Sequence, residues 1–113
     1  MKTVNSATVF EQVYKVIMDR KKSSPDDSYV ASLMKKGTDS ILKKIGEESA
    51  EVIIAAKNNN RDEQVHEITD LWFHLLVLMA GQGITLADIS EELQKRFGKS
   101  GLEEKAQRKT INL

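Results

Sequence analysis

Two pairs of carboxylates with the same spacing are the residues of this sequence best suited to chemistry. Glu48 and Glu51 lie three residues apart, and so do Glu67 and Asp70. On a helix, residues three apart project from one side, because each residue advances about 100°. Four carboxylates meeting between two packed helices would repel one another unless a cation lay between them. Ligands that offer only oxygen favour magnesium, or manganese, over zinc or copper.

Three further side chains lie on or near these acidic faces. Lys44 precedes Glu48 by one helical turn, and we expect it to neutralise a phosphate during catalysis and in substrate binding. Glu47 is a second candidate catalytic residue, as a further metal contact or by positioning water, although a helical wheel turns it outward. His74 follows Asp70 by four residues, so it would orient a carboxylate or contact substrate. A surface lysine and a core histidine are the alternatives.

The acidic residues also have a simpler interpretation. Helical glutamates are usually solvated, and Lys43 and Lys44 stand at i,i+4 spacing from Glu47 and Glu48. A second acidic pair at the margin of the next apolar helix argues against that interpretation. The alternative that remains is a non-enzymatic helical dimerisation module, which would show neither magnesium binding nor activity.

The elements that must position these residues are predicted to be helices. The chain contains one proline, and no stretch shows sustained alternation of apolar and polar residues. Capping residues and glycines predict five helices: Ala7 to Asp19 capped by Ser6, Ser28 to Gly37, Thr38 to Asn58, Asn60 to about Ala80, and Thr85 to Gly98. Capping boxes are expected at Asn60 with Glu63 and at Thr85 with Asp88.

The third and fourth helices are joined by a short polar turn, which predicts an antiparallel hairpin. We expect the core face of the third helix to comprise Ile41, Ile45, Val52, Ile53 and Ala56. After Asp70 the fourth helix is apolar nearly all round, and one small subunit hardly covers such a helix. The fold class is therefore all-α, a hairpin bundle completed as a homodimer or larger helical assembly.

Composition narrows the function further. The 113 residues predict a single domain, 1–113, with a polar tail over about 99–113. Lysine plus arginine equals aspartate plus glutamate, at 17 each, so nothing points to nucleic acid or membrane as a partner. Cysteine is absent, which excludes thiolate chemistry and fits the cytoplasm. The apolar stretch from Leu71 to Ala80 is too short to cross a bilayer.

The motif E-E-x-x-E at Glu47, followed after fifteen residues by E-x-x-D at Glu67, resembles a known signature. It is that of the all-α nucleotide pyrophosphohydrolases, which include the MazG-like and dimeric dUTPase-like enzymes. The chain is still more similar to the phosphoribosyl-ATP pyrophosphohydrolase family. Its departures are mild and spare the acidic set: Ser49 replaces a common alanine, and Trp72-Phe73 a common Leu-Tyr. Four segments covering most of the chain carry this resemblance: SYVASLMKKG (28–37), KKIGEESAEVIIAAKN (43–58), EITDLWFHLLVLMA (67–80) and RFGKSGLEEKAQRK (96–109).

The resemblance implies hydrolysis of phosphoribosyl-ATP to phosphoribosyl-AMP and pyrophosphate, the second step of L-histidine biosynthesis. Mg²⁺ held by Glu48, Glu51, Glu67 and Asp70 would activate a water that attacks the α–β phosphoanhydride. Many relatives are fused to a phosphoribosyl-AMP cyclohydrolase, which we expect here on a separate protein. The alternative within the superfamily is a housecleaning pyrophosphatase of noncanonical or deoxynucleoside triphosphates, with the same metal set and different base contacts.

Overall fold

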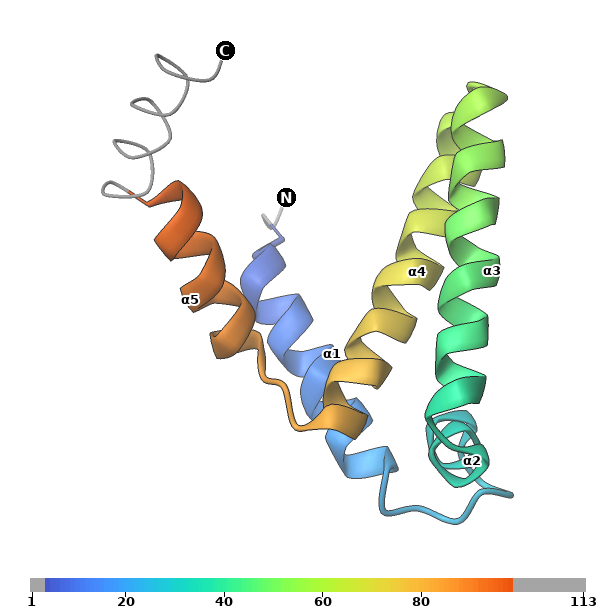
Figure 1. Cartoon of the computed structure of the whole chain (residues 1–113), viewed down its shortest axis with the longest axis vertical. Helices are drawn as coiled ribbons and strands as arrows, with labels where there is room; N and C mark the ends of the chain where they lie inside the picture. The colour runs from blue at the N-terminus through green and yellow to red at the C-terminus, as the bar shows by residue number, and fades with distance from the viewer. Residues whose placement is uncertain (1–3, 99–113) are drawn as a thin grey trace. The chain divides into compact units, whose positions relative to one another are not determined.

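The computed structural model describes residues 4–98, which form five helices. No strand occurs within these residues, so the predicted all-α class is confirmed. The helices, shown in Figure 1, are α1 (Ser6–Arg20), α2 (Tyr29–Lys36), α3 (Thr38–Lys57), α4 (Arg61–Gln82) and α5 (Leu86–Phe97). The tail predicted over about 99–113 lies outside the described residues.

The chain divides into two compact units, one ending at Gly83 and one beginning at Ile84. In the first unit α3 and α4 run antiparallel side by side, which confirms the predicted hairpin (Figure 1). α1 packs against α4, and α2 packs against α3. The expectation that residues 1–113 form one domain stays a prediction.

The helix ends follow local capping chemistry, with one correction. The Asn5 side chain accepts a hydrogen bond from the Thr8 backbone N–H at 3.2 Å, so the prediction that Ser6 caps α1 was wrong. Both residue types cap well, and Asn5 starts the helix one residue earlier. Ser28, the predicted start of the second helix, caps α2. Asn60 caps α4 as predicted by accepting from the Glu63 backbone N–H, and the reciprocal bond from the Glu63 side chain stays a prediction. α4 runs slightly past the predicted Ala80, ending at the left-handed Gly83.

The core of the first unit draws on all four of its helices. Its apolar members, each nearly inaccessible to solvent, are Ile17, Val30, Ala31, Leu33, Ile41, Ala55, Leu76, Val77 and Ala80. Lys21 at the end of α1 donates from Nζ to the Ala80 backbone oxygen at 2.9 Å, which satisfies a carbonyl in the last turn of α4. α1 and α4 are thereby joined by a polar contact as well as by packing.

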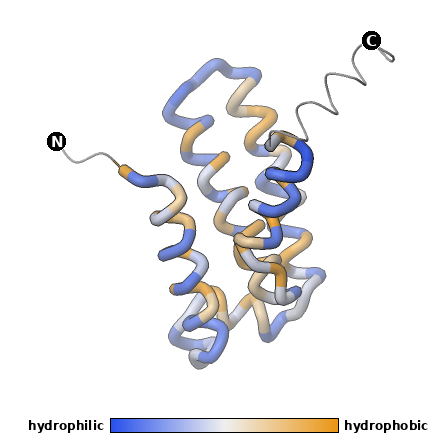
Figure 2. The backbone as a smooth tube through the Cα atoms, turned by 90° about the vertical axis from the view of Figure 1, so that its left-hand side faces the viewer, coloured by the Kyte–Doolittle hydropathy of each residue, from blue (hydrophilic) through white to orange (hydrophobic). Residues whose placement is uncertain are grey.

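The buried face of α3 includes Ile41 as predicted, but differs from the prediction in the second half of the helix. Ile53 is 63% exposed and Ala56 is exposed, whereas Ala55 is buried. Val52 to Ala56 are all apolar, so the local pattern does not favour one side. Figure 2 shows hydrophobic and hydrophilic stretches alternating along the hairpin, with a hydrophilic turn at its tip.

The second unit contributes α5, whose predicted capping box is confirmed. Thr85 N donates to the Asp88 carboxylate at 2.8 Å, and Asp88 N donates to the Thr85 hydroxyl at 3.1 Å. The helix ends before Gly98, as predicted. Within residues 4–98 no single helix is long and apolar enough to cross a membrane, and α4 and α5 meet that test only when taken together.

Candidate active site

The centre of the candidate site is a buried contact between the two hairpin helices. Glu48 on α3 is 8% exposed and His74 on α4 is 6% exposed. The Glu48 Oε1 atom lies 2.6 Å from His74 Nδ1. Polar side chains are rarely buried this deeply without a partner. The contact with His74 accompanies the burial of the Glu48 carboxylate.

His74 uses both ring nitrogens. Its Nδ1 also lies 2.9 Å from the backbone oxygen of Asp70, one turn earlier on α4. Its Nε2 lies 2.7 Å from the hydroxyl oxygen of Tyr29, the first residue of α2. The edge-on rings of Tyr29 and Phe73 pack against the imidazole, with centroid distances of 5.6 and 5.2 Å. Three helices therefore fix one imidazole.

The Glu48 carboxylate lacks a full set of partners. Its Oε1 atom is buried, and no donor in the described residues meets it with hydrogen-bond geometry, since the nearby imidazole Nδ1 is directed at the Asp70 carbonyl. Burial raises the pKa of Glu48, and the negative charges of Asp70 and Glu67 raise it further, whereas His74 and Lys44 oppose the shift. A cation beside Glu48 would satisfy the oxygen and offset the acidic neighbours.

Glu67 and Asp70 form a second cluster on α4, and a residue that sequence reasoning missed joins it. Ligand atoms of His66, Glu67 and Asp70 all lie within 4.8 Å of one another. His66 Nε2 is 3.4 Å from Asp70 Oδ2. This is the one such group found among the described residues. The cluster on α4 therefore offers two carboxylates and an imidazole, a set that accepts a divalent metal.

The remaining predicted residues surround this centre. Lys44 is half-buried, and its positive charge acts on both Glu48 and Tyr29. Glu47 is exposed, as the helical wheel predicted, and its charge contributes to the raised pKa of Tyr29. Glu51 is also exposed, so the structure brings Glu48, Glu67 and Asp70 into one electrostatic environment more closely than it does Glu51. The four-carboxylate metal site stays a prediction.

The residues present fit the magnesium that the acidic motif predicts. The Oε1 atom of Glu48 is a buried acceptor without a hydrogen-bond donor among the described residues, and a cation would satisfy it. Glu67 and Asp70, both half-buried, add two carboxylates whose charges already disfavour ionised Glu48. Their mutual repulsion would be relieved by a divalent cation, which is a role that Lys44 alone cannot fill.

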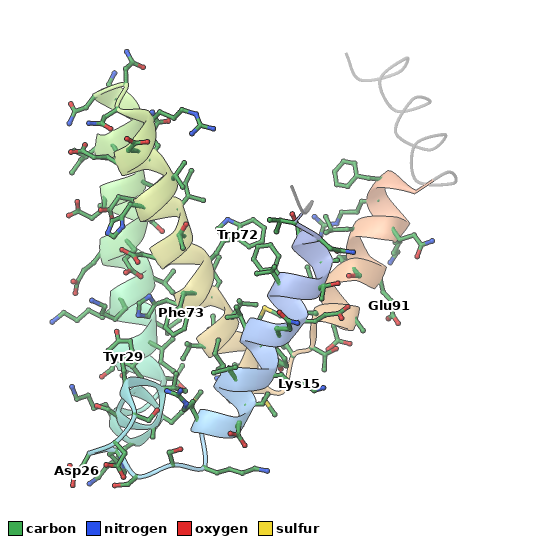
Figure 3. All side chains as sticks on the ribbon, turned by 180° about the vertical axis from the view of Figure 1, so that it is seen from behind. Lys15, Asp26, Tyr29, Trp72, Phe73 and Glu91 are labelled. Carbon is green, nitrogen blue, oxygen red and sulfur yellow. The ribbon has the colours of Figure 1, made fainter. Side chains whose placement is uncertain are left out.

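A groove beside this centre offers room for the organic part of a ligand. It has a volume of about 290 Å³ and runs between α1, α2 and α4. Tyr29 belongs both to the groove wall and, through its hydroxyl, to the His74 contact. Phe73 stacks near Tyr29 at a centroid distance of 6.5 Å, and Figure 3 shows both rings beside the hairpin. Arg20 and Gln12 supply polar groups to the opposite wall.

The chain is similar to known proteins of one family. The family model described as phosphoribosyl-ATP pyrophosphohydrolase matches residues 10–97. This chain belongs to that family. A phosphoribosyl-ATP pyrophosphatase from Hydrogenovibrio crunogenus is 52% identical over 91% of this chain and 95% of its own length. One from Geobacter sulfurreducens is 54% identical over 88% of this chain and 93% of its own length.

The range matched by the phosphoribosyl-ATP pyrophosphohydrolase family model contains every residue of the candidate site. The matched range includes α2, which carries Tyr29, and both helices of the hairpin. Of the two residues that sequence reasoning missed, His66 had a readable signal, because it stands at i,i+4 spacing from Asp70. Tyr29 had none in its spacing, since only the packing of α2 brings it to His74.

Proposed function

We propose that this member of the family hydrolyses phosphoribosyl-ATP to phosphoribosyl-AMP and pyrophosphate, the second step of L-histidine biosynthesis. The family match over residues 10–97 supports the reaction. The observation in the structure that carries it is the buried Glu48, with an orphaned oxygen and the charges of Asp70, Glu67 and Lys44 around it. We further propose that the enzyme acts in the cytoplasm.

Glu48, Glu51, Glu67 and Asp70 are the residues that we propose as magnesium ligands, with His66 adjoining the α4 pair. Magnesium would supply charge neutralisation for the triphosphate and a lowered pKa for water. The nitrogen of His66 is a poorer ligand for magnesium than a carboxylate oxygen. We therefore assign His66 to the Asp70 contact and keep the carboxylates as ligands.

The chain's own side chains then divide the remaining work. Lys44 binds phosphate oxygens and stabilises the negative charge of departing pyrophosphate. Glu47, which is exposed beside Glu48, positions the attacking water. The water oxygen bonds to the α-phosphorus and gives up its proton to solvent. The bond from the α-phosphorus to the bridging oxygen breaks, so pyrophosphate leaves and phosphoribosyl-AMP remains. The groove that Tyr29 borders is the nearest described space for the nucleoside half of the substrate.

We also propose that the enzyme is a homodimer that pairs through α4. Val65, Ile68, Trp72 and Leu75 follow one another at intervals of three, four and three residues, which is the spacing of a single helix face. All four are exposed in the single chain, and Trp72 is 49% exposed. A contiguous row of large apolar side chains on a helix is typical of a surface that another subunit covers.

Pyrophosphate release tests the proposed reaction. Phosphoribosyl-ATP, dCTP, dUTP and ATP are each supplied with and without magnesium. We expect fast, magnesium-dependent release from phosphoribosyl-ATP alone. Turnover of a deoxynucleotide or of ATP in its place would keep the chemistry and move the enzyme to housecleaning. Absence of turnover with every substrate would favour the non-enzymatic dimerisation module.

A further inference from the structure

The hydroxyl of Tyr29 is a polar contact of the site that the proposed mechanism leaves without a role. It lies 2.7 Å from His74 Nε2, on a different helix from both Glu48 and Asp70. Since His74 is buried, water has little access to that nitrogen. The Tyr29 hydroxyl is therefore its partner among the described residues.

The proton arrangement of this contact follows from the other side of the ring. Nδ1 lies 2.9 Å from the Asp70 carbonyl oxygen, which only accepts hydrogen bonds, and 2.6 Å from Glu48 Oε1. Nδ1 must then carry the proton. In the neutral ring Nε2 is the acceptor, and the Tyr29 hydroxyl donates to it. Burial raises the pKa of Tyr29, with a smaller opposing effect of Lys44, so the hydroxyl keeps its proton.

We propose that Tyr29 is a positioning residue of the hydrolase site, which by donating to His74 Nε2 holds the imidazole in its place between the Asp70 carbonyl and Glu48. Without this donor, Nε2 would be a buried acceptor with no partner. The ring would then gain by turning or shifting until Nε2 meets another donor. Such a movement takes the imidazole away from Glu48 and leaves that carboxylate free to leave its metal-binding orientation.

Tyr29 is held firmly enough to perform this role. The preceding residue, Ser28, is buried and caps α2 by accepting from the Ala31 backbone N–H at 3.2 Å. The Tyr29 ring stacks on Phe73 at 21° and meets His74 edge-on at 87°. These ring contacts do not need the hydroxyl. Tyr29→Phe therefore deletes one hydrogen bond and keeps the packing.

The test compares Tyr29→Phe with Tyr14→Phe, which removes a tyrosine hydroxyl from α1. Imidazole ¹⁵N shifts, assigned with His74→Gln, report the tautomer of His74, and calorimetry reports the binding of Mg²⁺ alone. We expect the Nδ1–H tautomer in the wild type and in Tyr14→Phe. In Tyr29→Phe we expect broadened or multiple His74 imidazole signals, which report more than one ring position, and magnesium binding weakened by about 10-fold, the lower end for loss of a residue that orients a ligand. Thermal unfolding should change little.

Two results would overturn the proposal: an Nε2–H tautomer in the wild type, or magnesium binding in Tyr29→Phe that is unchanged from the wild type. A loss of magnesium binding equal to that in Tyr14→Phe would also overturn it. The proposal rests on the proposed function for its catalytic meaning alone. A wild type that fails to hydrolyse phosphoribosyl-ATP would contradict that function, while the shifts and the calorimetry still decide the role of Tyr29.

Discussion

α4 presents two contrasting faces, and each is incomplete in a different way. Toward α3 it buries His74 against Glu48, where a carboxylate oxygen lacks a donor. Toward α1 it offers Trp72, which packs on Phe10 at a centroid distance of 4.7 Å yet stays half exposed. Figure 3 shows Trp72 on the side of α4 that faces α1. On the first face the buried carboxylate lacks a positively charged partner. On the second face large apolar side chains remain exposed to solvent.

The difference indicates what each face is for. A polar group buried without a full set of partners destabilises a fold, so its presence points to chemistry. An apolar groove of about 490 Å³ beside Trp72, between α1 and α4, contains few polar groups that would orient a substrate. Such a surface gains most from another apolar surface. We therefore assign catalysis to the first face and subunit pairing to the second.

The largest predicted effect tests how far the apolar side chains on the second face of α4 are exposed. Leu75 and Leu76 are adjacent on α4, with 38% and 4% of their surfaces exposed. Leu76→Ala should lower the free energy of unfolding by about 3 kcal/mol, because it leaves a cavity. Leu75→Ala should cost less than half of that in chemical denaturation of the dissociated subunit, where no partner covers Leu75. Equal losses at concentrations at which the protein is monomeric would contradict the exposure of Leu75 in the single chain.

Glu51 is the sharpest test of the first face, because the structure leaves it exposed on α3. We expect Glu51→Gln to reduce magnesium-dependent pyrophosphate release by about 100-fold, equivalent to about 2.7 kcal/mol, through loss of a metal ligand. Circular dichroism should show an intact fold. Glu63→Gln, an exposed glutamate in the first turn of α4, is the control. Normal turnover in Glu51→Gln would remove Glu51 from the metal site and leave its α3 and α4 neighbours.

Trp72→Glu addresses the subunit contact. A charge at the centre of a buried apolar interface should raise the dimer dissociation constant by about 30-fold or more, since central aromatic residues contribute about 2 kcal/mol. Sedimentation equilibrium over a range of concentrations measures this constant. Leu42→Glu, at a comparably exposed leucine on α3, should leave it near the wild-type value. If both variants behave alike, α4 is not the specific interface.

Gly46 gives the smallest predicted effect. Apart from its chain neighbours and the backbone of its own helix, no atom of residues 4–98 lies within 4 Å of where its Cβ would be, so nothing in the described fold requires a glycine inside α3. Gly46→Ala should raise the free energy of unfolding by about 1 kcal/mol, because alanine favours the helix. Thermal unfolding measures the gain. A loss of stability would show that the partner subunit approaches α3 at this point, and would extend the interface beyond α4.

Much of the fold could be predicted from local signals. Asn60 and Thr85 cap their helices as expected, and Gly37 and Gly83, both with positive φ, mark helix ends. Capping depends on neighbours within three or four residues, so the sequence contains the needed information. Where two good caps adjoin, as at the start of α1, the sequence alone could not choose between them.

The site was predictable to the extent that it lies on single helices. The i,i+3 spacing of Glu67 and Asp70 correctly places them together, and the position of His74 relative to Asp70 correctly places it on their side. Packing between helices decides which apolar residues of α3 are buried. It also brings Tyr29 to His74. No spacing along the chain encodes such contacts between distant segments.

The measurement that tests the central claim most directly is pyrophosphate release from phosphoribosyl-ATP as magnesium is titrated. It compares the wild type with Asp70→Asn and with Asp62→Asn, an exposed aspartate in the first turn of the same helix. We predict saturable magnesium dependence in the wild type and in Asp62→Asn, and nearly abolished release in a folded Asp70→Asn. Activity in Asp70→Asn equal to that of the wild type, or release that does not depend on magnesium, would contradict the assignment of this face of α4 to metal-dependent catalysis.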